Sequence, residues 1–257
     1  MKLLSIPIAL SLFALIALCL RLGWIAGRRR LATLGESANE GLGAVDGAVF
    51  GMMGLLLAFT FTGAASRFDA RRDLIVQETN NIGTAWLRLD LLSEGPRAQA
   101  RDLMRQYLDQ RLDVYRDATD RARTAQSLAK VAELQDQIWK LVLAQSREDK
   151  SQPIVQSLVP ALNDMFDIAT ARVLATRQHP HFAIFGMLLV LVLVSAFLVG
   201  FSQAKVPRQS MLHLVGFAAT TALALYVIID LEYPRVGLIR VDNFDQALVE
   251  LRASMNP

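Results

Sequence analysis

Charged side chains stand next to the ends of the apolar segments of this sequence, where they could attract ions or pair with one another. Arg67 and Arg71 follow one apolar segment, and Asp230 and Glu232 follow another. Rings of arginine select anions in membrane pores, whereas arginine and carboxylate pairs fix chain segments to each other. Two hypotheses stay open: an anion vestibule built on Arg67 and Arg71, or ion pairs that tie the C-terminal segment to the charged region.

A second set of ionisable residues is expected at the opposite ends of these segments. Arg21 follows the first apolar segment, Asp46 precedes the second, and His213 lies near the start of the fourth. Ionisable groups near hydrocarbon are costly and usually face a partner or a water path, so the three could form one polar cluster. The simpler interpretation is that Asp46 complements a helix N-terminus, Arg21 snorkels and His213 makes an interfacial hydrogen bond.

Motifs for metal binding or catalysis are weak. His179 and His181 flank a proline without a cysteine or a histidine at helical spacing, which favours a capped junction over a metal site. Cys19 is the single cysteine, which excludes a fold built on disulfides. The sequence has no nucleophile and base pair, phosphate-binding glycine loop or zinc motif, so we predict no enzyme, no cofactor and no metal.

The elements that must position these residues follow from an uneven composition. The 257 residues are 53% hydrophobic, with a mean hydropathy of +0.32. Residues 66–180 hold 17 of the 27 Lys and Arg and 16 of the 24 Asp and Glu. This pattern excludes a single soluble globule and a disordered chain. The formal net charge of only +3 argues against nucleic acid as a partner.

Four uncharged windows are long enough to cross a bilayer, which takes about 20 apolar residues. They are residues 3–20, 47–66, 182–204 and 209–229. The first is longer than the apolar core of a signal peptide, and Arg28, Arg29 and Arg30 follow it in place of a cleavage site, so we predict a retained anchor. Four spans make the lipid bilayer a partner and put both termini and the middle segment on one side.

The predicted fold is all-α: an integral membrane protein with four transmembrane helices and an extramembrane antiparallel helical bundle inserted between the second and third. The second span is predicted to continue as one long helix, because few breakers follow it. Three further helices are predicted at about 97–120, 125–147 and 153–180, and the last of them runs into the third span. The predicted boundaries are transmembrane helix 1 at 1–26, a short link at 27–42, transmembrane helix 2 at 43–65, the bundle at 66–180, transmembrane helix 3 at 181–204, a short link at 205–209, transmembrane helix 4 at 210–231 and a C-terminal tail at 232–257.

The charges leave the orientation open. Basic residues in the two short links favour an inward position for the links, whereas arginines at both ends of the middle segment favour an inward position for the bundle. The side of the membrane on which the bundle lies is therefore unresolved.

Glycines recur at helical spacing in the second span. Gly43, Gly47 and Gly51 lie four residues apart, and Gly54 follows one turn later. A face without side chains lets another helix approach closely, which is a main route to helix association in lipid. These four are predicted to form a helix-packing face, so self-association is expected. The alternative is that glycine is merely tolerated in a membrane helix.

Four sequence blocks, at 47–62, 65–72, 78–90 and 230–237, resemble the bacterial bestrophin-like domain family, which is distantly similar to bestrophin anion channels. Bestrophins are pentamers with four spans and a helical part between the second and third. The resemblance implies a multi-pass protein of the bacterial inner (cytoplasmic) membrane, a homo-oligomer, and small anions as the permeant species. The segment after Pro234 lacks the acidic run of bestrophin calcium clasps, so no calcium site is implied.

Two pairs of residues have the four-residue spacing that a pore neck on one helix needs: Leu55 with Phe59, and Leu57 with Phe61. Two functions therefore stay in view. One is a homo-oligomeric channel with the second span near its axis. The other is a membrane-anchored interaction or sensory protein whose helical bundle binds a partner, without conduction.

Overall fold

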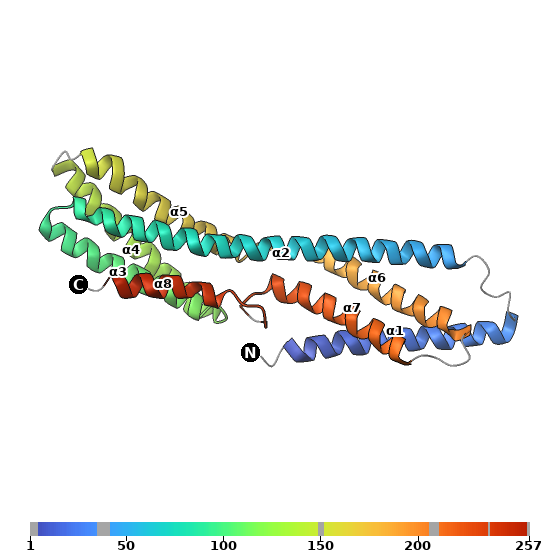
Figure 1. The fold of residues 1–257 in the computed structure, drawn as a ribbon. Coiled ribbons are helices and arrows are strands. Elements are labelled where there is room, and N and C mark those ends of the chain that lie inside the picture. Colours follow the sequence, from blue (N-terminus) through green and yellow to red (C-terminus); the bar gives the residue numbers. More distant parts are fainter. Residues whose placement is uncertain (1–4, 35–41, 149–151, 206–210, 236, 256–257) are drawn as a thin grey trace. The chain divides into compact units, whose positions relative to one another are not determined.

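Helices account for almost all of the chain that the structure describes. The computed structural model describes residues 5–34, 42–148, 152–205, 211–235 and 237–255. Of these residues 91% are helical and none lies in a strand, which confirms the all-α prediction. The helices (Figure 1) are α1 (Ser5–Leu34), α2 (Leu42–Arg88), α3 (Glu94–Arg116), α4 (Arg121–Glu148), α5 (Val159–Ala175), α6 (Phe182–Ser202), α7 (Met211–Glu232) and α8 (Asp242–Ser254).

Four of these helices are long and apolar enough to cross a membrane, as predicted. The candidate spans are Ile6–Thr33, Gly43–Leu91, Phe182–Lys205 and Met211–Glu232. At 1.5 Å per residue, α6 extends about 31 Å, which matches a hydrocarbon thickness of about 30 Å. The chain is therefore a multi-pass membrane protein. Of the two predicted short links, residues 35–41 and 206–209 lie outside the described residues, and residues 27–34, predicted as part of the first link, belong to α1.

α2 is one uninterrupted helix of 47 residues, which confirms the prediction that the second span continues as a long helix. Gly63 and Gly83 both lie inside it, because a single glycine weakens a helix by only about 1 kcal/mol and does not end it.

The junction between α5 and α6 corrects the prediction of one helix running from residue 153 into the third span. α5 ends at Ala175 and α6 begins at Phe182. Pro180 stands between them and lacks the amide N–H that a helix interior requires. Nδ1 of His181 accepts a hydrogen bond from the backbone N–H of Ala183 at 3.3 Å, so this histidine caps α6.

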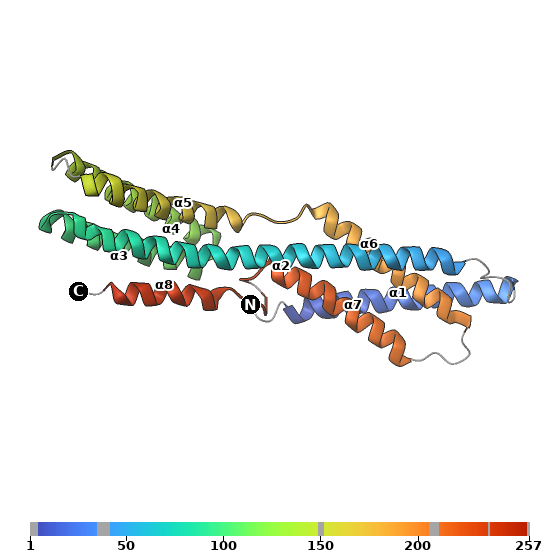
Figure 2. The same cartoon turned by 45° about the horizontal axis from the view of Figure 1, so that its top comes forward.

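The chain divides into two compact units, and α2 contributes to both. The first unit comprises Met1–Phe68 and His179–Ile239, and α1 packs along α6 and α7 in it (Figure 2). Ile16 of α1, Val192 of α6 and Ala222 of α7 are buried in its apolar core. The first half of α2 adds Ala64 to the same core.

Glycines let α1 and α6 approach closely. A Cβ atom added at Gly23 would lie 1.9 Å from the carbonyl oxygen of Phe197, and one added at Gly200 would lie 1.9 Å from that of Leu20. Such close backbone contacts stabilise helix association in lipid. Burial of apolar surface contributes little there, because lipid is itself apolar, so dispersion contacts provide the stabilisation instead. Gly23 and Gly200 were not among the glycines predicted to pack, which all lie in the second span.

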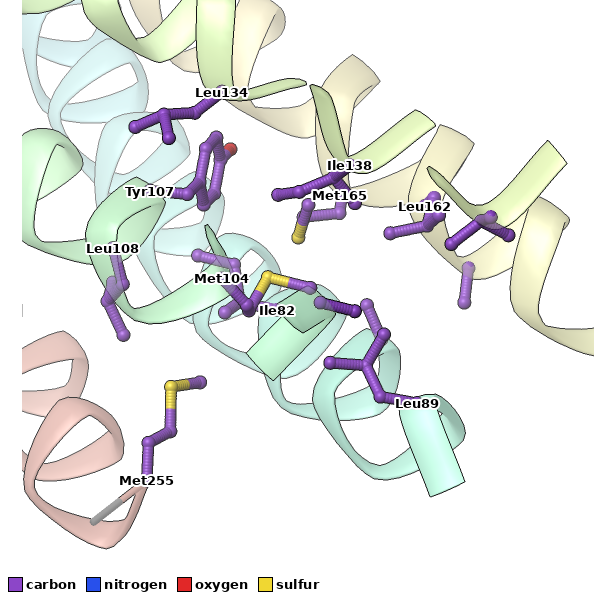
Figure 3. Packing of buried hydrophobic residues seen from close by; sticks show 14 of the residues in the cluster. Ile82, Leu89, Met104, Tyr107, Leu108, Leu134, Ile138, Leu162, Met165 and Met255 are labelled. Atoms are coloured by element: carbon purple, nitrogen blue, oxygen red, sulfur yellow. The ribbon is translucent and has the colours of Figure 1, made fainter. Parts of the chain in front are cut away.

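The second unit comprises Asp69–Gln178 and Arg240–Pro257 and has its own core. The second half of α2 lines this core together with α3, α4, α5 and α8. Figure 3 shows Ile82 of α2, Met104 of α3, Ile138 of α4 and Met165 of α5 meeting there, all fully buried. Met255, at the end of α8, is buried in the same cluster, so a segment predicted only as a C-terminal tail contains a core helix.

Candidate functional site

α2 presents two different faces in its apolar half. On one face Ala64 is buried in the core of the first unit. On the other, a Cβ atom added at Gly43, Gly47, Gly51 or Gly54 would meet no atom within 4 Å. The four glycines of the predicted packing face thus contact no other helix in the part of the chain that the structure describes. We call the side of α2 that carries them the open side.

The two candidate pairs of pore residues differ in their surroundings. Leu55 and Phe59 are 59% and 67% exposed. Helical spacing places Leu55 next to Gly51 and Phe59 at the edge of the open side, away from the face that carries Ala64. Leu57 packs against the core of the first unit, although Phe61, one turn later, is exposed. Only the pair formed by Leu55 and Phe59 therefore projects as a unit away from the packed helices.

An ion pair joins α2 to the end of α7. Nε of Arg67 donates to both carboxylate oxygens of Glu232, at 3.1 and 2.9 Å. The Glu232 side chain is fully buried. Nδ1 of His179 lies 3.1 Å from Oε1 of Glu232, and the His179 ring stacks on Tyr233 with centroids 4.7 Å apart. Because a buried carboxylate is stable only with partners, Arg67 and His179 make the burial of Glu232 tolerable.

Arg71 binds the end of a helix. It is buried, and its Nε and Nη2 donate to the carbonyl oxygens of Ala175 and Gln178 at 3.3 and 2.9 Å. The last carbonyl groups of a helix have no partner within the helix, and Arg71 donates to one of them, that of Ala175, and to the carbonyl of Gln178 in the junction after α5. The contact of Arg67 with Glu232 is an ion pair of the kind that the second hypothesis describes, whereas Arg71 donates to backbone carbonyl groups; both guanidinium groups have partners within the chain.

Asp230 closes a tight turn after α7. Its carboxylate is buried and accepts the backbone N–H groups of Leu238 at 3.0 Å and Ile239 at 2.7 Å. Oδ1 also accepts the hydroxyl of Tyr226 at 3.0 Å. A Cβ atom added at Gly237 would lie 1.4 Å from Oδ1 of Asp230. Only glycine leaves room for the carboxylate here, which explains why an aspartate and a glycine stand seven residues apart.

The three residues of the predicted polar cluster lie in the first unit. Oδ2 of Asp46 accepts the hydroxyl of Ser202 at 3.0 Å, which joins the start of α2 to the end of α6. Arg21 is exposed on α1, and His213 is exposed in the first turn of α7. Ser202, which the sequence analysis did not single out, is thus a partner of Asp46.

The two histidines that flank Pro180 have separate roles. His179 contacts Glu232, and His181 caps α6. Among the described residues, no group of three or more His, Cys, Asp or Glu is arranged to hold a metal ion.

A buried charged cluster in the second unit was not predicted. Glu78 of α2, Arg111 of α3 and Arg172 of α5 are all buried. Nε of Arg111 donates to Oε1 of Glu78 at 2.6 Å, and the hydroxyl of Tyr115 donates to Oε2 at 2.8 Å. Arg172 donates to Oε2 of Glu78 and also pairs with Asp245 of α8. We call these five residues the Glu78 cluster; it joins four helices.

The electrostatics of the Glu78 cluster are balanced. Two arginines face two carboxylates. Burial raises the pKa of Tyr115 well above its ordinary value, and the negative charge of Glu78 raises it further. Burial alone would lower the pKa of Arg111, but the negative charge of Glu78 and the hydrogen bond to it raise it above its ordinary value. Tyr115 therefore stays neutral and Arg111 stays charged.

A signal for this cluster exists in the sequence. Glu78 follows Ile75 by three residues and precedes Ile82 by four, so it lies on the buried face of α2. Arg111 likewise stands between Leu108 and Tyr115 on the predicted apolar face of its helix. A charge on an apolar face indicates a buried partner, because an unpaired buried charge is too costly.

Comparison with known proteins gives a match to a family model. The model of the Bestrophin-like domain matches residues 10–243, which reach from α1 into α8. No curated protein and no solved structure matches the chain.

Proposed function

The chain belongs to the Bestrophin-like domain family, and on this premise we propose that it forms a homo-oligomeric membrane channel for small anions, with α2 near the axis. The observation that carries the proposal is the open side of α2. Its four glycines, at positions 43, 47, 51 and 54, meet no atom within 4 Å in the described chain. Small anions are assigned because the bestrophins, to which the family is related, conduct them.

The glycines of the first unit support a second copy as the partner of α2. Gly23 and Gly200 are filled by backbone of the neighbouring helix within the chain, so this protein uses glycine for close helix contact. A glycine face makes few close dispersion contacts with fluid lipid, whereas a helix packed on that face makes many. Packing of α2 against α2 of a neighbouring copy supplies that helix.

Leu55 and Phe59 are the residues that the proposal places at the neck. Both are exposed and lie one turn apart, away from the face of α2 that carries Ala64. In a symmetric oligomer each contributes one apolar ring, and apolar constrictions gate pores by excluding water. Replacing both with alanine widens the neck and is expected to raise conductance.

The oligomeric interface is tested by mass measurement in native detergent or nanodiscs. The wild type should be an oligomer, and a chain carrying Gly47→Leu and Gly51→Leu should shift toward the monomer. The matched control carries Gly186→Leu and Gly216→Leu, which are also glycines of candidate spans with nothing within 4 Å. A monomeric wild type, or equal loss of the oligomer in both variants, contradicts the proposed interface.

Conduction is tested by chloride flux from proteoliposomes. The wild type should release chloride under an applied potential, and the alanine variant of Leu55 and Phe59 should release it faster. A stable oligomer without flux of chloride or potassium at any pH or potential contradicts the channel. That result favours the alternative of a membrane-anchored interaction or sensory protein.

A further inference from the structure

The end of α1 carries a dense group of exposed basic side chains. Arg28, Arg29 and Arg30 are consecutive and exposed in α1. Lys205 is exposed in the short turn Gln203–Lys205 that follows α6, and this turn contacts α1. We call these four residues the basic rim.

Packing against α6 places the basic rim just outside the hydrocarbon. α1 and α6 run side by side, with Gly23 against Phe197 and Gly27 against Phe201 and Ala204. α6 matches the hydrocarbon thickness and ends at Ser202, which puts the hydrocarbon boundary on α1 near Gly27. α1 continues to Leu34, so the arginines of the rim occupy the next turn, at the level of lipid headgroups.

Aromatic rings hold two of these arginines. The guanidinium carbon of Arg28 lies 5.8 Å from the centroid of the Trp24 ring, and that of Arg30 lies 5.9 Å from the centroid of the Phe201 ring. Tryptophan is typical of the membrane interface, and cations over aromatic faces are attracted to them. The two guanidinium groups are therefore kept at the interface.

The basic rim keeps its positive charge. Among the described residues no carboxylate forms an ion pair with it, and the Asp46 carboxylate at this end of the unit bonds to Ser202. Some exposed arginines of the second unit differ, because Arg116 and Arg123 each pair with an aspartate one turn away, at 3.6 and 3.4 Å. Guanidinium groups at headgroup level without an ion pair in the described part of the chain suit phosphate, which they bind through two parallel hydrogen bonds.

We propose that the basic rim binds the phosphodiester headgroups of anionic phospholipids such as phosphatidylglycerol. Anionic lipids attract basic side chains at the membrane surface, and each such side chain strengthens binding about fivefold. Basic residues that act only by directing insertion give no preference among lipids once the protein is folded. A preference of the folded protein for anionic lipid therefore distinguishes lipid binding from a role in insertion alone. This test does not depend on whether the protein conducts ions.

The test is thermal unfolding of the full chain in a neutral detergent, titrated with phosphatidylglycerol or with phosphatidylcholine. Phosphatidylglycerol should raise the Tm of the wild type and phosphatidylcholine should not. Arg28→Gln, Arg29→Gln and Arg30→Gln together should raise the phosphatidylglycerol concentration for a half-maximal shift on the order of 100-fold. The corresponding triple lysine variant should keep most of the effect.

The matched control removes the same charge from exposed positions of the second unit, with Arg121→Gln, Lys130→Gln and Arg147→Gln, and should respond as the wild type does. Equal shifts with the two lipids, or an equal loss of response in the control, would overturn the proposal. Stabilisation by soluble glycerol phosphate as strong as that by phosphatidylglycerol would also overturn it, because the occupant would then be a free anion.

Discussion

Replacing Glu78 by glutamine tests whether a balanced buried cluster holds the second unit together. The Glu78 carboxylate is fully buried and accepts hydrogen bonds from Arg111, Tyr115 and Arg172. Glutamine has nearly the same shape but no charge, so packing is kept. The variant leaves two buried guanidinium groups facing the single carboxylate of Asp245.

The expected cost is large. Removing one partner of a buried ion pair costs about 3–5 kcal/mol, because the charge that remains is still desolvated. For a unit of roughly 130 residues, 1 kcal/mol corresponds to about 3–5 °C in Tm. The Glu78→Gln variant should therefore unfold about 10–25 °C below the wild type.

Tryptophan fluorescence on heating in detergent measures this shift, because Trp86 and Trp139 both belong to the second unit. Asp136→Asn is the matched control, since it removes an exposed carboxylate that lies 2.5 Å from Nζ of Lys140. Exposed pairs contribute about 0–1 kcal/mol, so its Tm should fall by less than about 5 °C. Adding Arg111→Met to Glu78→Gln restores the charge balance and should recover part of the loss.

A Glu78→Gln variant that melts within the range of the Asp136→Asn control would refute this reasoning. It would mean that the two arginines find other compensation, for instance water, in the folded protein.

Three further predictions follow from single contacts. Gly237→Ala should lower Tm sharply, because the new methyl group overlaps the carboxylate of Asp230, and retention of wild-type Tm would contradict the geometry of this turn. Gly23→Ala should destabilise the first unit, because the new methyl group meets a backbone carbonyl of α6. Gly186→Ala has open space and should leave stability unchanged. The helical circular dichroism signal during unfolding in detergent compares the two variants. The raised pKa of Tyr115 means that the folded protein favours the neutral phenol. The stability that Tyr115 contributes is therefore complete below the ordinary tyrosine pKa of 10.0 and is lost as the pH rises toward the raised pKa. Between pH 9 and 11 the wild type should therefore lose stability more steeply than a Tyr115→Phe variant, and parallel pH profiles would contradict this.

Several parts of the fold were predictable because the membrane imposes a simple rule. A span needs about 20 apolar residues whose backbone groups are all bonded within the helix, so four uncharged windows predict four helices. The continuity of α2 was predictable for the same kind of local reason, because breakers are few after Gly47. The capped junction before α6 was predicted from His179 and His181, and His181 does cap α6. The end of α5 at Ala175 was predicted too late, because a proline marks an interruption without saying how far before it the helix ends.

The sequence predicted the type of interaction at the candidate sites better than it predicted which residues pair. Arg67 and Glu232 both flank spans, which suggested ion pairs at the membrane edge, and the structure joins these two. The need of Glu78 for a partner can be read from its apolar face, but its partners come from α3 and α5, tens of residues away along the chain. Which charges meet there depends on how the helices are rotated against one another.

The sequence by itself determined which segments are helical, which of them are apolar enough to span a membrane, and to which family the chain is similar, because these properties reside in local composition and order. The tertiary structure alone decided which glycines are filled and which are bare. Gly23 and Gly200 lie where two backbones touch, while Gly43, Gly47, Gly51 and Gly54 face away from the packed helices of the described chain. Spacing places residues on one face of a helix, but the rotation of that helix, set by the packing of all its neighbours, decides what the face meets.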